Sequence, residues 1–159
     1  MAAPRIAICF FGITRSLSHS HGSIEANVLE PARAAGVTRV FAHFFRQEHI
    51  YNPRTSEIGE LDPDEYRLIG PDELELEEPE SCLEEWAFDR IAACGDTWKD
   101  GHKSVRNLVH QLHSLQRVTT MAGAWEPDLW IFARPDLRYH DSLARVFARA
   151  QAGPSETAW

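Results

Sequence analysis

An arginine, a proline and an aspartate follow an apolar run near the end of the chain, in the segment Asp128–Leu137. The run before Arg134 is rich in aromatic and β-branched residues, which is typical of a strand buried on both faces. Pro135 has no amide hydrogen, so it should end the strand and leave Asp136 at its carboxyl end. Ligands of open α/β sheets bind at that edge, where a carboxylate can hold a divalent cation and the cation a diphosphate. Asp136 is therefore a candidate metal ligand.

A second candidate site is the turn after an early apolar run. Gly12, Thr14, Arg15 and Ser16 place a glycine, two hydroxyls and a guanidinium within five residues. Backbone amides of such a turn, together with a planar guanidinium, can bind a phosphate. The turn has neither a G-x-G-x-x-G sequence nor a P-loop lysine, so an ordinary turn with a surface arginine is the simpler alternative.

Polar residues also recur along one helical face, where Ser104, Asn107, Gln111 and Ser114 follow one another at spacings of three and four. A solvated helix face is one interpretation. Exposed faces usually carry Glu and Lys, however, whereas amides and hydroxyls are typical of a face that lines a polar ligand. The stripe therefore predicts ligand contacts from this helix.

The chain has eight histidines but no H-E-x-x-H sequence, and His110 and His113 have no carboxylate in register. A histidine-based zinc site is therefore disfavoured. His43 lies at the end of an expected strand, and we expect it to line the cleft beside Asp136. No serine or cysteine has the G-x-S-x-G context of a hydrolase nucleophile.

The elements that must position these residues follow from periodicity and from Gly and Pro punctuation. We expect strands at 5–11, 38–45 and before Arg134, and helices at 24–35 (capped by Ser23, interrupted by Pro31), 81–93, 103–122 and 143–150. The segment 47–100 is expected to be an irregular acidic insertion with one short strand at 66–69. This order predicts an α/β fold, a mostly parallel Rossmann-like sheet with helices on both faces.

Length, charge and cysteine content limit the number of domains, the kinds of partner and the location of the protein. The 159 residues suit one domain, and the formal net charge of −8 disfavours general nucleic-acid binding. The acid is concentrated, because Glu57–Asp89 holds fourteen acidic residues and one basic residue, Arg67, which leaves the rest net basic. No run approaches the ~20 apolar residues of a transmembrane span. The three cysteines show no C-x-x-C spacing, which favours a reducing, cytoplasmic location.

Three separated parts of the chain together resemble a family. They are Phe11–Leu17 followed by Ser23–Pro31, then Asn107–Leu115, and then Asp128–Leu137. They are similar to bacterial glycosyltransferase-like proteins of the GT-A type. Such proteins pair a G-x-x-R-S loop with an Asn-x-x-x-Gln helix and a hydrophobic strand that ends in Arg-Pro-Asp.

The resemblance implies transfer of a sugar from a nucleotide diphosphate sugar to a hydroxyl of a glycan or other acceptor. Asp136 looks like the carboxylate of the Asp-x-Asp element that holds Mn²⁺ or Mg²⁺ against the diphosphate. Arg134 stands where that element has its first acid, and could neutralise phosphate charge directly. Gly12 and Arg15 match the nucleotide loop. Asn107 and Gln111 match donor-sugar or base contacts.

GT-A enzymes usually continue beyond this strand, whereas the sequence stops 23 residues after Asp136. We therefore expect a domain truncated at its C-terminus, or one that a second subunit completes as a homo-oligomer, and we assign no general base. Two alternatives stay open: a non-catalytic nucleotide- or sugar-binding module, and an α/β domain whose motifs serve packing alone.

Overall fold

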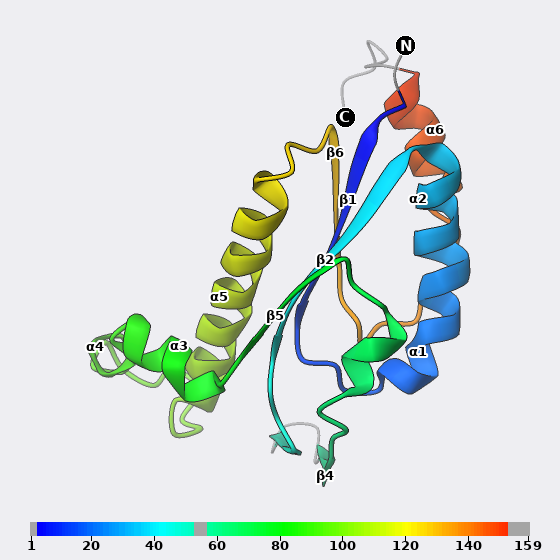
Figure 1. Ribbon diagram of the computed structural model, residues 1–159. Helices are drawn as coiled ribbons and strands as arrows, with labels where there is room; N and C mark the ends of the chain where they lie inside the picture. The colour runs from blue at the N-terminus through cyan, green and yellow to red at the C-terminus, as the bar shows by residue number, and fades with distance from the viewer. Residues whose placement is uncertain (1–2, 53–56, 153–159) are drawn as a thin grey trace.

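The protein folds into three layers, with a parallel sheet between two layers of helices (Figure 1). The computed structural model describes residues 3–52 and 57–152. The four strands of the sheet lie in the order β5-β2-β1-β6 and all pair in parallel. Their bounds are Arg5–Gly12 (β1), Val37–Phe45 (β2), Glu73–Glu77 (β5) and Leu129–Ala133 (β6). The fold class expected from the sequence is thus confirmed.

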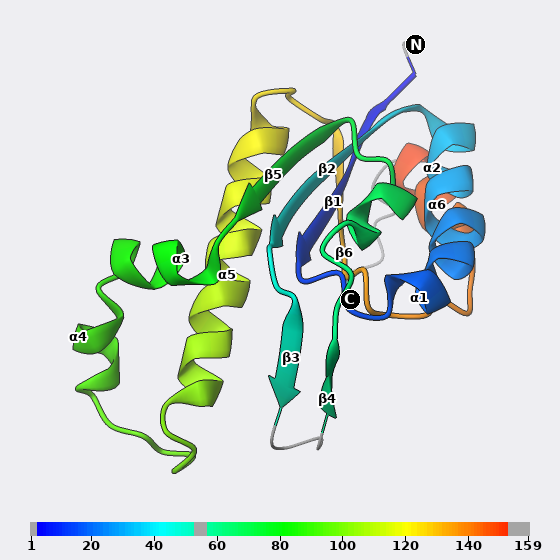
Figure 2. The same ribbon diagram turned by 60° about the horizontal axis from the view of Figure 1, so that its bottom comes forward.

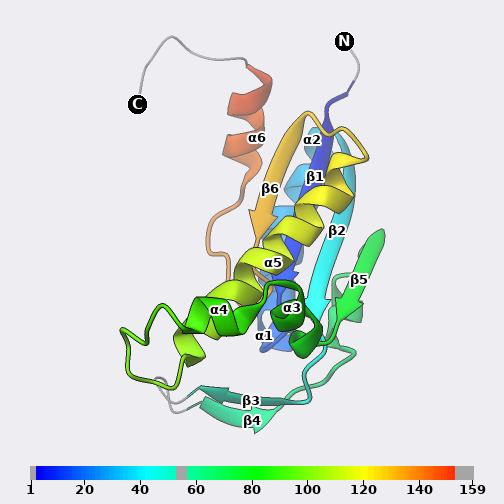
Figure 3. The same ribbon diagram turned by 90° about the vertical axis from the view of Figure 1, so that its left-hand side faces the viewer.

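Different helices cover the two faces of the sheet, and α5 has one face largely to itself (Figure 3). The helices are α1 (Leu17–Ile24), a π-helical turn (Glu25–Leu29), α2 (Glu30–Ala35), α3 (Pro79–Glu85), α4 (Phe88–Ala92), α5 (Lys103–Gly123) and α6 (Ala144–Gln151). Successive residues of β1 serve opposite faces, as strand geometry requires. Ile6, Ile8 and Phe10 pack with the α1, α2 and α6 layer, whereas Ala7 and Cys9 pack against α5.

The first helical segment begins at Leu17, before the expected start, and Ser23 lies inside it rather than at its N-cap. Pro31 does interrupt it, and a π-helical turn precedes α2. Pro31 has no amide hydrogen to donate to the carbonyl of Asn27. The amide of Leu143 donates to that carbonyl at 2.9 Å, so the C-terminal segment binds where the helix is irregular.

The strand before Arg134 is not buried on both faces, contrary to the sequence prediction. Among the described residues, β6 pairs with β1 alone and forms an edge of the sheet. Phe132 is 46% exposed and stacks on Trp130 with ring centroids 6.0 Å apart. An apolar run with aromatic residues suits a half-covered edge strand as well as a central one, so the run itself did not distinguish them.

The acidic segment 47–100 is more regular than expected. It contains an antiparallel hairpin, β3 (His49–Asn52) with β4 (Glu57–Glu60), which extends beyond the carboxyl ends of β1 and β2 (Figure 2). A 3₁₀ turn, Glu65–Leu68, stands where a short strand was expected, and the true strand is β5. The expected helix at 81–93 is divided into α3 and α4 at Ala87, whose φ is 48°.

The long helix α5 begins at its expected residue and ends one residue later than expected. Leu108 and Leu112 are more than half exposed, whereas His113 and Ser114 are fully buried against the sheet. Val109, Val118 and Ala122 are buried as well, so the inward face of α5 is partly apolar and includes Ser114 of the polar stripe. No helix within the described ranges has the length and apolar composition that a bilayer span requires.

Candidate functional site

A pocket of about 320 Å³ lies at the carboxyl ends of the strands, bounded by the turn after β1, the turn after β6, the hairpin strand β3 and the first half of α5. The chain leaves β1 toward β2 on one side, and β6 lies on the other. In open α/β sheets this reversal of strand order forms the crevice in which ligands bind. The size falls within the range of about 300–1,000 Å³ typical of small-molecule sites.

The turn after β1 carries Arg15 into the pocket. Gly12 has a φ of 103°, a conformation that glycine adopts at little cost, and it turns the chain out of the strand. Its amide donates to the hydroxyl of Ser114 on α5 at 2.8 Å. The carbonyl of Thr14 then accepts the amide of Leu17 at 3.0 Å, at the start of α1. The turn is thus held at both ends.

The turn after β6 is held by residues of α1 and by its own tyrosine. The hydroxyl of Ser20 donates to the carbonyl of Pro135, which is buried. The amide of Arg134 donates to the Tyr139 hydroxyl at 3.0 Å, and the amide of Tyr139 donates to the Ser23 hydroxyl at 3.1 Å. These bonds fix the direction in which Arg134 and Asp136 leave the strand.

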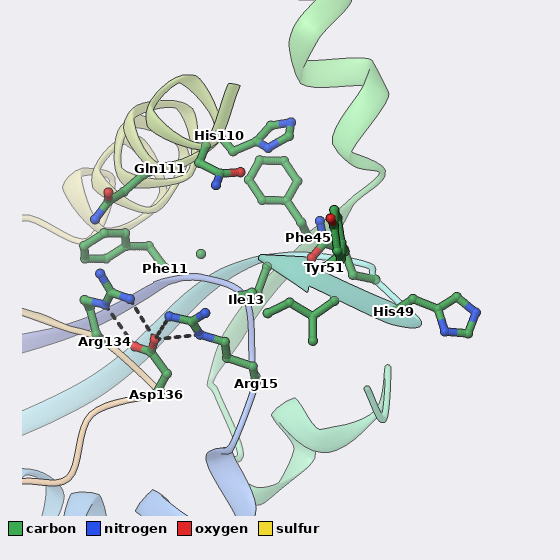
Figure 4. Close-up of a pocket in the computed structure, with 14 residues that line it drawn as sticks. Phe11, Ile13, Arg15, Phe45, His49, Tyr51, His110, Gln111, Arg134 and Asp136 are labelled. Carbon is green, nitrogen blue, oxygen red and sulfur yellow. Dashed lines mark hydrogen bonds and ion pairs between the residues drawn. The ribbon is translucent and has the colours of Figure 1, made fainter. Parts of the chain in front are cut away.

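Arg15, Arg134 and Asp136 form one ion-pair cluster in the pocket (Figure 4). Arg134 contacts the carboxylate with Nε at 2.9 Å and Nη2 at 2.7 Å, and Arg15 contacts it with Nε and Nη2, both at 3.0 Å. Burial by itself would raise the pKa of Asp136, but the hydrogen bonds and charges of the two guanidinium groups outweigh it and lower the pKa. Asp136 is therefore ionised at neutral pH and holds the two arginines together.

This cluster does not fit a divalent cation. Both carboxylate oxygens of Asp136 accept bonds from guanidinium groups, and its side chain is only 8% exposed. Mg²⁺ and Mn²⁺ favour several oxygen ligands, whereas the cation here would meet two fixed positive charges. Glu57 is the other carboxylate at hand, and it is paired with Arg15 at 2.9 Å. The expected metal site at Asp136 thus finds no support in the geometry, and the two arginines supply the positive charge instead.

The rest of the pocket is polar on the α5 side and aromatic near the hairpin. Asn107, His110 and Gln111 line it from α5, and Phe45 and Tyr51 line it from the β2–β3 side (Figure 4). Burial lowers the pKa of His110, so its imidazole is neutral at pH 7. Its Nε2 lies 3.1 Å from the carbonyl of Pro79, which accepts the Nε2 hydrogen.

The structure brings most of the sequence-predicted site residues together. The pocket is lined by Gly12, Arg15, Asn107, Gln111, Arg134 and Asp136. Two others lie in the same turn but not in this lining: Thr14 contributes its carbonyl to the start of α1, and Ser16 borders a neighbouring groove beside β4. Parallel strands bring their carboxyl ends to one edge, which is why residues so far apart in sequence meet here.

His43 does not line the pocket, contrary to expectation. Its side chain is fully buried between β2 and α5, where it contacts Ser114 and Glu77. In a strand, residue 43 points to the same face as residues 41 and 45, which is the face that α5 covers. That alternation was the signal that could have placed it.

Other residues at and near the site were missed. Sequence reasoning did not identify Phe45, Tyr51 and His110 as pocket residues, nor the pairing of Glu77 with His43 and His113. The alternation Glu-Leu-Glu-Leu-Glu over β5 was available as a signal, because it places Glu73, Glu75 and Glu77 on one face of a strand.

No family model, curated protein or solved structure matches the chain.

Proposed function

We propose that the pocket binds a nucleotide diphosphate sugar and that the chain is a glycosyltransferase-like domain, which transfers the sugar to an acceptor hydroxyl. The observation that carries this proposal is the pair of guanidinium groups at the carboxyl edge of a parallel sheet. Planar guanidinium groups bind phosphate oxygens in pairs, and this edge is where such folds take nucleotides.

Arg134 has donor capacity left for a phosphate. It uses Nε and Nη2 toward Asp136, while its Nη1 group makes no bond to the described residues. Arg15 shares its Nη1 with Glu57, whose side chain is 36% exposed, so solvent screens that pair. Asp136 and Glu57 formally offset the two positive charges, and Asp136 fixes both guanidinium groups, so that their remaining N–H donors are preorganised for a diphosphate.

The remaining lining suits the other parts of such a donor. Tyr51 is 62% exposed and offers an aromatic face on which a nucleobase can stack. The amides of Asn107 and Gln111 offer donors and acceptors for sugar hydroxyls or base edges.

The free cysteines Cys9 and Cys82 are buried, and we place the protein in the cytoplasm, where thiols stay reduced.

One observation favours a second candidate, a nucleotide- or sugar-binding module without turnover. Among the described residues that line the pocket, Asp136 is the sole carboxylate, and two arginines occupy both of its oxygens. An inverting transfer needs a general base within reach of the acceptor hydroxyl. Asp136 cannot serve as that base while it holds the arginines.

A panel of nucleotide diphosphate sugars, followed by calorimetry, tests the binding proposal. We expect at least one uridine or guanosine diphosphate sugar to bind, with an affinity that changes less than about twofold between excess chelator and added Mn²⁺, because arginines replace the metal. Binding that requires Mn²⁺ would restore the metal site at Asp136. A panel without any binder would contradict the proposal.

Turnover separates the two candidates. The sugar donor found in the panel is incubated with the protein and with simple hydroxyl acceptors, and release of the free nucleoside diphosphate is followed. Release above the rate without protein supports the transferase, whereas tight binding without release supports the module.

A further inference from the structure

A line of hydrogen bonds crosses the interior beside the pocket and ends at the turn after β1. It joins the side chain of Trp86, which directly follows α3, and side chains of α5, β5 and β2 to one backbone amide. The order is Trp86, His113, Glu77, His43, Ser114 and Gly12. His43, His113 and Ser114 are fully buried. A buried polar network is stable only if each donor meets an acceptor, so its proton positions can be worked out.

The tryptophan end fixes the state of His113. Trp86 Nε1 lies 2.9 Å from His113 Nδ1, and an indole nitrogen can only donate. His113 Nδ1 is therefore the acceptor, and a neutral ring carries its proton on Nε2. That proton points to Glu77 Oε2 at 2.7 Å.

The glycine end fixes the state of Ser114 and His43. The Gly12 amide donates to Ser114 Oγ, so the hydroxyl has its own proton to give. His43 Nε2 lies 3.1 Å from Glu77 Oε2, and an ionised carboxylate only accepts, so Nε2 carries the His43 proton. His43 Nδ1 is then an acceptor, and the Ser114 hydroxyl shares its one proton between this nitrogen, at 2.8 Å, and the backbone carbonyl of His43, at 2.9 Å. The two ends thus give one consistent arrangement with neutral imidazoles and a charged Glu77.

We propose that Ser114 and His43 are positioning residues for the turn that carries Arg15, an inference that rests on the proposed function of the pocket. Ser114 holds the Gly12 amide toward α5, and His43 orients the Ser114 hydroxyl with its Nδ1 atom and its carbonyl so that a lone pair of the hydroxyl faces that amide. With φ at 103°, the Gly12 peptide sets the direction in which the chain leaves β1 and therefore where Arg15 meets Asp136.

A metal ion is the competing explanation of this cluster. The ligand atoms of His43, Glu77 and His113 lie within 4.8 Å of one another, which is close enough to surround a cation such as Zn²⁺. A metal would need free lone pairs on both Nε2 atoms. The His113 proton would then move to Nδ1 and face the Trp86 N–H across 2.9 Å, donor against donor. The arrangement of Trp86 therefore favours the proton-ordered network.

Nitrogen-15 NMR of the free protein tests the network directly. We expect both imidazoles to be protonated on Nε2 and unprotonated on Nδ1 near pH 7.5, and to keep those states when Zn²⁺ is added. A proton on either Nδ1 would overturn the order of the bonds. Stoichiometric Zn²⁺ binding with loss of both Nε2 protons would show a metal centre instead.

The Ser114→Ala variant tests the effect on the turn. In the free protein we expect the Gly12 amide and the Arg15 Nε–H resonances to shift, together with the His43 Nδ1 resonance, which has lost its donor. The control is Thr120→Ala, which removes an exposed hydroxyl from the same helix. Within the described part of the chain, that hydroxyl bonds only the carbonyl of Gln116. Unmoved Gly12 and Arg15 resonances in Ser114→Ala would refute the positioning role.

Ligand affinity gives a second, separable readout. For a nucleoside diphosphate that binds wild type, Ser114→Ala should weaken binding about fivefold to tenfold, the scale of one lost hydrogen bond, and Thr120→Ala should not. Unchanged affinity in Ser114→Ala would contradict the role. If wild type binds no nucleotide, the proposed function fails, while the resonances of the free protein still decide the network.

Discussion

The double variant Arg15→Ala/Arg134→Ala is expected to bind a nucleoside diphosphate about 10²- to 10⁴-fold more weakly than wild type. Each guanidinium would contribute charge-assisted hydrogen bonds of about 1.5–3 kcal/mol, and every 1.4 kcal/mol is tenfold in affinity. The loss is enlarged because Asp136, without its two partners, presents a negative charge to the diphosphate. Calorimetry with uridine and guanosine diphosphate measures the change.

The matched control removes two arginines from the opposite side of the protein. Arg33 on α2 and Arg145 on α6 are exposed, and the variant Arg33→Ala/Arg145→Ala loses the same total charge. It should bind the nucleotide within about twofold of wild type, since exposed charges beyond a Debye length are screened. Equal losses in the two double variants would mean that net charge alone, rather than the cluster at Asp136, governs binding.

Lysine in place of the two arginines separates charge from geometry. The variant Arg15→Lys/Arg134→Lys keeps both positive charges but loses the planar fork that grips Asp136 in pairs of bonds. Binding should fall between wild type and the alanine variant. Full affinity in the lysine variant would show that two point charges suffice, and that the preorganised fork has no role.

The Glu77→Ala variant is expected to lower the free energy of unfolding by about 2–4 kcal/mol. It leaves the Nε2–H groups of His43 and His113 without their acceptor, and an unsatisfied buried donor costs about 1–3 kcal/mol. Glu77 itself is 17% exposed, so water can satisfy part of the deficit. Urea unfolding at pH 7.5 measures the loss.

Two other variants check the cause. Glu75→Ala, two residues away on β5, removes an ion pair with the exposed Arg117 and should cost less than about 1 kcal/mol. Glu77→Gln keeps a carbonyl oxygen for the imidazoles and should cost less than Glu77→Ala. An alanine variant as stable as wild type would contradict the network.

The stability contributed by Glu77 also has a defined pH dependence. Burial would raise the pKa of Glu77, but the hydrogen bonds from His113 and His43 outweigh it and lower the pKa below its ordinary value. A carboxyl group with a lowered pKa in the folded state stabilises the fold above its ordinary pKa, and this contribution is lost as the pH falls through the lowered value. The difference between wild type and Glu77→Ala should therefore shrink below about pH 4.5.

The titration of His43 occurs at higher pH than that of Glu77, and it also makes the fold more stable at neutral pH than in acid. Burial lowers the pKa of its imidazole, although Glu77 and Glu75 of β5 oppose the shift and His113 of α5 adds to it. The unfolded chain then takes up a proton near the ordinary histidine pKa, before the folded protein does. The free energy of unfolding therefore decreases as the pH falls below about 6.5, and the full contribution of neutral His43 is present above that value.

The sequence was sufficient for the parts of the fold with strong periodicity. The strands around Ile8 and Val40 and the helix α5 were predicted within about two residues, because apolar runs and Gly or Pro punctuation are local signals. The location of Arg15 and Asp136 at one edge of the sheet followed from the rule that parallel strands share a carboxyl edge.

The remainder depends on contacts between distant residues. Nothing local to Asp136 shows that Arg15, 121 residues earlier, would bind its carboxylate. The strand β5 was missed because its glutamates have poor strand propensity, and their partners lie elsewhere: Arg39 with Glu73, Arg117 with Glu75, and two histidines with Glu77. His43 was misplaced because the alternation along β2, which sets it on the same face as Phe41 and Phe45, was not applied to it.

Because Pro31 has no amide hydrogen, the carbonyl of Asn27 is free to accept a hydrogen bond from a part of the chain that is distant in sequence. Leu143 donates to the Asn27 carbonyl, and the side chains of Asn27 and Ser23 bind the backbone of Tyr139. Detachment of residues 139–147 would withdraw these partners from the irregular helical segment. The helices α1, α2 and α6 should consequently open as one cooperative unit, and the turn that bears Asp136 would open with them.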